Sequence, residues 1–130
     1  MKKRIFSIIV ALVMVMMIVL PTMADSHSFL TATSSTPYYH SGTFSKSQSL
    51  KWKLENGDFT GQNGATKLTV RPYLNGNKMS NARTFTATTA GGERDYWTSY
   101  QSYYGTINVK VNHDSNNTGA KATVTGTWYF

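Results

Sequence analysis

The stretch Leu50-Lys51-Trp52-Lys53-Leu54 alternates apolar and charged side chains with a period of two. Successive side chains of a strand point to opposite faces, so Leu50, Trp52 and Leu54 are expected to share one face and the two lysines the other. This pattern predicts a strand of an antiparallel sheet that is buried on one face and solvated on the other. Asn56-Gly57 follows as a turn signal and is expected to end the strand.

The same alternation recurs downstream. Further strands are expected at 67–74, 83–88, 106–111 and 120–130, with turns at 75–77 and 90–92. Pro72 cannot donate to a ladder, which places its strand near an edge or a bulge. Short strands with turn signals at roughly every 8–12 residues predict an all-β fold, a small antiparallel β-sandwich. The predicted core is Leu50, Trp52, Leu54, Leu68, Val70, Phe85, Ile107, Val109, Val111, Val124 and Trp128, with Leu74, Ala87, Ala122, Gly126 and Phe130 also expected to face inward.

The C-terminal third carries a resemblance to a known architecture. The stretches Tyr104–Val111 and Ala122–Trp128 resemble the final hairpin of small secreted bacterial jelly-roll modules. The resemblance implies that the sandwich is jelly-roll-like. It implies nothing about function, because one fold hosts many unrelated functions.

The N-terminus has the three parts of an export signal. Met1-Lys2-Lys3-Arg4 is positively charged, residues 5–20 are almost entirely apolar, and Thr22-Met23-Ala24 offers small residues for cleavage. This predicts a signal peptide at 1–24, of a kind typical of bacteria, and one secreted domain at 25–130. The apolar run is shorter than the roughly 20 residues of a membrane span, so no span is expected after cleavage. The protein is therefore expected outside the cell or associated with its surface.

Composition limits the chemistry. The chain has 130 residues and no cysteine, so it can form no disulfide and has no thiol nucleophile. Three of the 13 Lys and Arg residues precede residue 25 and all 6 acidic residues follow residue 24, so the expected mature domain carries a formal charge of +4. This mild charge permits attraction to anionic wall polymers but is no nucleic-acid footprint, and no nucleic-acid partner is expected.

No catalytic constellation stands out. His27, His40 and His113 lie in no metalloprotease motif, and no serine lies in a nucleophile elbow. Glu93 and Asp95 flank Arg94 and are expected in a solvated loop. The stretch 114–119 mimics the first half of a calcium loop, but the late carboxylate is replaced by Thr125, so a polar hairpin loop is expected. The sequence therefore predicts a protein that is not an enzyme and needs no cofactor.

Aromatic side chains are the most suggestive feature. The segment 96–104 has aromatics at helical spacing and is expected to form a loop or a short helical turn. The chain has more aromatics than one small core can hold, so some must be exposed. Exposed Tyr and Trp can stack on sugar rings or anchor a protein. We therefore expect a surface glycan, a cell-wall polymer or a protein as partner, bound by Tyr96, Trp97, Tyr100, Tyr103 and Tyr104.

Two other functional classes remain open. Small, basic, aromatic-ended secreted β proteins include bacteriocins, and the chain is similar in these general respects to the lactococcin 972 type. Alternatively, the aromatic end at 126–130 resembles the closing strand of outer-membrane barrels. Most of the expected strands are shorter than the 9–11 residues that such a barrel needs and are rich in Ser and Thr.

Cleavage after Ala24 would create a possible metal site. The new end would be Asp25-Ser26-His27, which resembles the amino-terminal copper and nickel motif. The α-amine, the amide nitrogens of Ser26 and His27, and the His27 imidazole could form the square plane that Cu(II) and Ni(II) favour. Mass spectrometry of the secreted protein and Cu(II) titration of a His27→Ala variant test this hypothesis.

Overall fold

The structure is a computed structural model that describes residues 29–40 and 42–130. The expected signal segment 1–24 and the hypothetical metal site at Asp25, Ser26 and His27 lie outside the described residues. Within the described part, no helix is long and apolar enough to cross a membrane. The elements are β1 (Phe29–Ala32), β2 (Tyr38–Tyr39), β3 (Phe44–Lys46), β4 (Lys51–Gln62), β5 (Leu68–Leu74), β6 (Asn77–Lys78), β7 (Arg83–Phe85), β8 (Gly92–Asp95), α2 (Thr98–Gln101), β9 (Gly105–His113) and β10 (Lys121–Tyr129).

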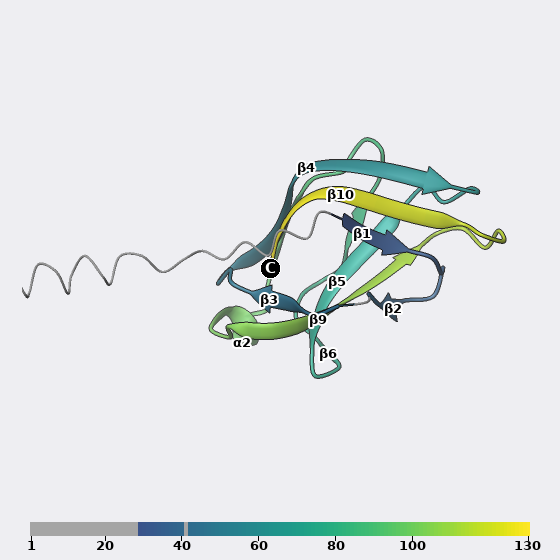
Figure 1. Cartoon of the computed structure of the whole chain (residues 1–130). Helices are drawn as coiled ribbons and strands as arrows, with labels where there is room; N and C mark the ends of the chain where they lie inside the picture. Colours follow the sequence, from purple (N-terminus) through teal and green to yellow (C-terminus); the bar gives the residue numbers. More distant parts are fainter. Residues whose placement is uncertain (1–28, 41) are drawn as a thin grey trace, which may run out of the picture.

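The strands form two antiparallel sheets. The first sheet has the order β1-β10-β4-β8. The second sheet has the order β2-β9-β5-β6, with β3 also paired to β9 and β7 also paired to β5. In Figure 1, β4, β10 and β1 lie side by side as one layer over β5 and β9. The predicted all-β sandwich is confirmed.

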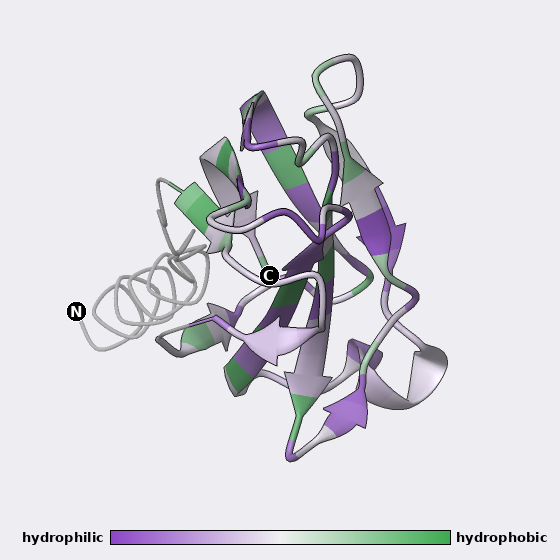
Figure 2. Ribbon diagram, turned by 90° about the vertical axis from the view of Figure 1, so that its right-hand side faces the viewer, coloured by the Kyte–Doolittle hydropathy of each residue, from purple (hydrophilic) through white to green (hydrophobic). Residues whose placement is uncertain are grey.

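An aromatic stack fills the space between the sheets. Trp52 is fully buried, and its ring centroid lies 5.9 Å from Phe130, 6.4 Å from Trp128 and 6.5 Å from Phe85. Aliphatic residues from β5, β9 and β10 pack in the same core. Figure 2 shows apolar and polar segments alternating along the strands. Such packing is the main stabilising force available to a domain without disulfides. Of the predicted core, every residue except Leu50 is buried.

Two predicted inward positions are wrong because each lies just outside its strand. Leu50 is 58% exposed. It precedes the first ladder residue of β4, and its carbonyl oxygen accepts the Tyr96 N–H at the chain's approach to the sheet. Ala87 is exposed because β7 ends at Phe85. The Thr89 N–H then donates to the Thr86 carbonyl oxygen and closes a turn there.

Asn56-Gly57 does not end its strand, contrary to the sequence prediction. β4 continues to Gln62, and the two residues form a bulge instead. Leu54 pairs with Trp128, whereas Phe59 pairs with Val124, so β4 carries one residue more than β10 across this interval. Asn56 has the left-handed φ of 51° that its turn signal predicts. The extra residue moves the inward face of β4 from even to odd positions.

The β5 region confirms a turn and explains a proline. Asn75-Gly76 joins β5 to β6 as a two-residue hairpin turn with φ of 49° and 82°. β5 is an interior strand, but Pro72 lies between its pairing with β7, which ends at Val70, and its pairing with β6, which begins at Tyr73. The missing N–H of Pro72 therefore falls where β5 changes partner from β7 to β6, and the continuous register with β9 shows no bulge there.

Candidate functional site

The aromatic segment 96–104 does not form one continuous platform. Trp97 and Tyr104 are exposed at 43% and 58%, whereas Tyr100 and Tyr103 are half-buried against the core. Tyr96 is 2% exposed, and its burial raises the pKa of its phenol. The prediction that Tyr96 offers its ring to a ligand is therefore wrong.

The local backbone explains this division. The predicted short helical turn is present as α2, which begins after Trp97 in an extended conformation. Tyr96 forms an isolated bridge with Ser80, and the Trp97 N–H donates to the Met79 carbonyl oxygen over 2.8 Å. This pairing turns the Tyr96 side chain into the sandwich and the next side chain outward, as the alternation of extended chain requires.

A hollow of about 310 Å³ lies beside Trp97. We call it the Trp97 hollow. It is lined by Asn81 from the β6–β7 connection and by Glu93, Arg94, Asp95, Tyr96 and Trp97 from β8 and its exit. Ser80, which precedes Asn81 and bridges to Tyr96, accepts the Trp52 Nε1–H at its Oγ over 2.8 Å. One exposed indole thus stands beside amide, carboxylate and guanidinium groups.

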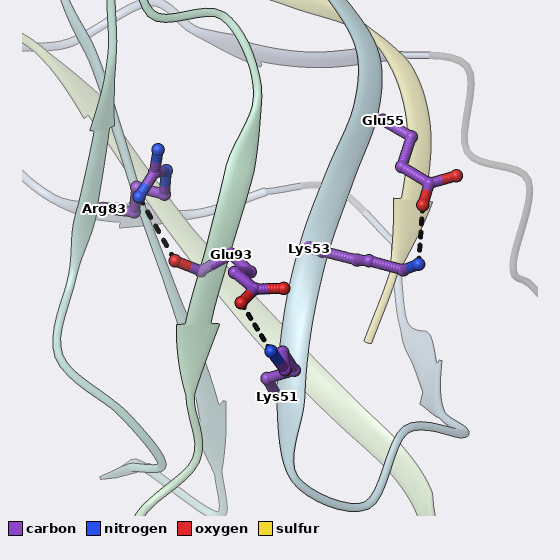
Figure 3. Close-up of polar contacts among 5 residues, drawn as sticks. All are labelled: Lys51, Lys53, Glu55, Arg83 and Glu93. Atoms are coloured by element: carbon purple, nitrogen blue, oxygen red, sulfur yellow. Dashed lines mark hydrogen bonds and ion pairs between the residues drawn. The ribbon is translucent and has the colours of Figure 1, made fainter.

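One ion pair and two hydrogen bonds hold β8 and the residue before it, and Figure 3 shows the contacts of Glu93. The Lys51 Nζ lies 2.5 Å from the Glu93 carboxylate. Arg83, on β7 of the other sheet, donates to the carbonyl oxygen of Glu93 over 3.2 Å (Figure 3). It also donates to the carbonyl oxygen of Gly91 over 2.8 Å. Arg83 therefore connects the two sheets at their open edge. The predicted loop around Glu93 and Asp95 is wrong, because β4 pairs with these residues and makes them a strand. Both are exposed, and the Glu93 carboxylate is paired.

Tyr104 serves a different structure, which sequence reasoning missed. Lys46, on β3, is 2% exposed, and its Nζ lies 4.4 Å from the Tyr96 ring centroid and 4.9 Å from that of Tyr104. The Nζ donates to the carbonyl oxygens of Gln48 and Gln101. Burial lowers the pKa of Lys46 to about 8. The only sequence signal was that Lys46 shares an alternating face with Phe44.

A second, smaller hollow lies on the outer face of the second sheet. Its volume is about 120 Å³, and it is lined by Pro37, Thr69, Arg71, Tyr73, Ala82, Lys110 and Asn112. These residues come from β5, β9 and two connections, so no local pattern in the sequence could have grouped them. Asn81 lines the Trp97 hollow and Ala82 lines this one, so the two hollows share the β6–β7 connection.

The stretch 114–119 is a polar loop, as the sequence predicts, but the predicted hairpin is wrong, because the loop joins β9 of the second sheet to β10 of the first. It is tied to the loop after β4. The Asp114 carboxylate accepts the N–H groups of Thr66 and Lys67 and the Thr66 hydroxyl. Burial alone would raise the pKa of Asp114, but these hydrogen bonds outweigh it and hold the pKa at about 2. In residues 29–40 and 42–130, no three His, Cys, Asp or Glu side chains gather closely enough to hold a metal ion.

Comparisons with protein-family models, with curated proteins and with solved structures found no match to this chain. Function is therefore inferred from the chemistry of the two hollows. Of the five aromatics proposed from the sequence, Trp97 and Tyr104 have large exposed surfaces, and Trp97 is the one whose neighbours are polar groups around a hollow.

Proposed function

We propose that the protein is a secreted, non-catalytic binding protein that recognises a carbohydrate at the cell surface through the Trp97 hollow. The observation that carries this proposal is the exposed indole of Trp97 beside Asn81, Arg94 and Asp95. Binding sites of this kind combine an apolar surface with a few polar groups that fix orientation. A sugar offers the matching chemistry, with C–H groups on its ring faces and hydroxyl groups at its edges.

The hollow is held in place before any ligand arrives. The Trp97 backbone is bonded to Met79, Tyr96 is packed in the core, and Arg83 holds β8 against the other sheet. A rigid site loses little conformational entropy when it binds. This favours recognition by a small number of contacts, which is what a shallow, open hollow can provide.

The carboxylates support binding rather than hydrolysis. A glycosidase needs two carboxyl groups on opposite sides of the scissile bond, one acid and one base or nucleophile. Glu93 and Asp95 instead lie two residues apart on one strand, and Glu93 is paired with Lys51. In this arrangement the Asp95 carboxylate can accept hydrogen bonds from sugar hydroxyls, and the Asn81 amide can both accept from them and donate to them.

A glycan array probed with the secreted protein tests the proposal, followed by titration of the strongest ligand. We expect Trp97→Ala to weaken binding at least tenfold. Tyr104→Ala is the matched control, because it removes an exposed aromatic that lies outside the hollow, and it should bind like the parent.

Two outcomes would contradict the proposal: binding to no glycan, or equal binding by the Trp97→Ala variant. A growth-inhibition assay with the same proteins addresses the antimicrobial alternative. Inhibition of bacterial growth without glycan binding would favour that alternative over the carbohydrate-binding function.

A further inference from the structure

Charge is divided unequally between the two sheets. The described strands of the first sheet contain four acidic residues (Glu55, Asp58, Glu93, Asp95) and four basic ones (Lys51, Lys53, Arg94, Lys121), so they balance. The described strands of the second sheet contain five basic residues and no acidic one: Lys46, Arg71, Lys78, Arg83 and Lys110. Among the described strands, the excess of positive charge therefore lies on the second sheet.

Three of these cations share the outer face of the second sheet. Tyr39 on β2 pairs directly with Lys110 on β9, and Lys110 pairs directly with Arg71 on β5. Side chains of directly opposed residues point to the same face, so these three form a row across three strands. Two residues along β5, Tyr73 pairs with Lys78, which extends the same face. We call Arg71, Lys110 and Lys78 the basic row.

Aromatic rings hold the central cation in place. The Lys110 Nζ lies 4.4 Å from the Tyr39 ring centroid and 4.9 Å from that of Tyr73. The two rings meet edge to face at 5.9 Å. Cation–π contacts of this kind fix an ammonium without neutralising it. The Lys110 side chain is therefore held in position where it lines the hollow.

The basic row has no internal counter-charge. Opposed like charges destabilise a sheet, yet Arg71 and Lys110 are direct partners. Within residues 29–40 and 42–130, the ion pairs are Lys51–Glu93 and Lys53–Glu55, both on the first sheet. The Arg71 Nε is buried and has no hydrogen-bond partner among the described residues. A repulsive pair with an unused donor at a hollow has the chemistry of an anion site.

We propose that the outer face of the second sheet binds an anionic polysaccharide, whose sulfate, phosphate or carboxylate groups occupy the hollow between Arg71 and Lys110. The guanidinium supplies a planar pair of donors and the ammonium a fixed point charge, which together suit such an oxyanion. Thr69 and Asn112 line the same hollow and offer hydrogen bonds to neighbouring sugar hydroxyls. Lys78, further along the face, meets the next anionic group of a polymer.

Other polyanions fit this face less well. A membrane surface would need several apolar anchors beside the cations. Tyr39, which contacts Lys110, is an exposed aromatic side chain, but the lining of the hollow is mostly polar. A single-stranded nucleic acid stacks its bases on free aromatic faces. Here Lys110 covers one face of Tyr39 and of Tyr73, and Tyr73 is 8% exposed. A hydroxylated, anionic chain matches the polar lining best.

Calorimetric titration with dextran sulfate, and with unsulfated dextran of equal length, tests the proposal. We expect dextran sulfate to bind and dextran not to bind at this face. The double variant Arg71→Gln/Lys110→Gln should weaken binding of dextran sulfate at least tenfold. The matched control Lys53→Gln/Lys121→Gln also removes two charges, but from the first sheet, and should change affinity less than threefold.

Further measurements distinguish binding at this site from nonspecific electrostatic attraction and from binding at the Trp97 hollow. Trp97→Ala should keep its affinity for dextran sulfate, which makes this proposal independent of the proposed function. Removal of the repulsive pair should not lower the melting temperature in low salt. Equal weakening by the two double variants would overturn the proposal, and so would retention of affinity in Arg71→Gln/Lys110→Gln. Binding to vesicles of anionic phospholipid but not to dextran sulfate would overturn it as well.

Discussion

The ammonium nitrogen of Lys46 lies 4.4 Å from the ring centroid of Tyr96, and the Lys46 side chain is buried. Two carbonyl oxygens and two aromatic rings surround it. This environment stabilises the charge only in part, because burial lowers the pKa of Lys46 from 10.5 to about 8. Lys46 therefore links β3 to Tyr96 and Gln101, on either side of Trp97 in the chain.

The first prediction concerns stability at alkaline pH. The folded pKa of Lys46, about 8, lies below the unfolded value of 10.5, so the unfolded chain holds the extra proton between these pH values. The cost of the buried charge is complete below pH 8 and declines as the pH rises towards 10.5. Urea unfolding from pH 7 to 10 should therefore show the wild type gaining stability relative to Lys46→Met. A difference that does not change with pH would contradict the depressed pKa.

The second prediction separates core from surface aromatics. Trp52 is fully buried and stacks on Trp128 and Phe130, so Trp52→Ala should cost about 3–5 kcal/mol in the free energy of unfolding. Trp97→Ala, at an exposed position, should cost less than about 1 kcal/mol. Chemical denaturation of both variants measures this. Similar midpoints for Trp52→Ala and the parent would refute the packing described here.

The third prediction concerns the bulge between β4 and β10. Gly126 has a φ of 142°, and a Cβ there would lie 2.7 Å from the Leu54 Cδ1 and 2.8 Å from the Glu55 carbonyl oxygen. Gly126→Ala should therefore cost more than about 2 kcal/mol, from backbone strain and from overlap together. Gly76→Ala is the control, because its φ of 82° is strained but nothing lies within 4 Å of the added methyl group. Thermal melts should rank Gly126→Ala well below Gly76→Ala.

The strands themselves were predictable, and the errors have local causes. The alternation of apolar and polar residues predicts burial correctly where a strand is paired on both sides. Trp52, Val109 and Val124 are therefore buried as predicted. Leu50 failed because the ladder of β4 begins one residue later. The signal at Asn56-Gly57 gave the correct positive φ for Asn56 but the wrong structure, because a bulge depends on the partner strand β10. A window of sequence contains no information about that partner.

The candidate sites were predictable only in part for the same reason. Surplus aromatics correctly indicated an exposed residue in 96–104, and Trp97 is one. Which neighbour turns inward was decided by the bridge between Tyr96 and Ser80, a contact across 16 positions of the chain. Tyr39, Lys110 and Arg71 lie next to one another only because of the register of three strands. The periodicity within any one of these strands does not predict that the three side chains are neighbours.

The last prediction concerns stability in acid and depends on Asp114. Its carboxylate accepts two backbone N–H groups, from Thr66 and Lys67 over 2.8 and 3.0 Å, and the Thr66 hydroxyl. These bonds hold its folded pKa at about 2, against 3.8 in the unfolded chain. The unfolded chain therefore takes up the proton first, so this stabilisation is present above pH 4 and is lost as the pH falls towards 2.

Asp114→Asn keeps the shape of the side chain but removes the charge, and it should cost about 1 kcal/mol at neutral pH, because the carboxylate is largely exposed. Asp58→Asn is the control, because Asp58 is also exposed and its carboxylate has no hydrogen-bond or ion-pair partner among the described residues. Denaturant unfolding between pH 7 and 2 should show the wild type losing its advantage over Asp114→Asn below pH 4. If that advantage persists to pH 2, or if Asp58→Asn shows the same profile, the tie between the two loops does not stabilise the fold through this carboxylate.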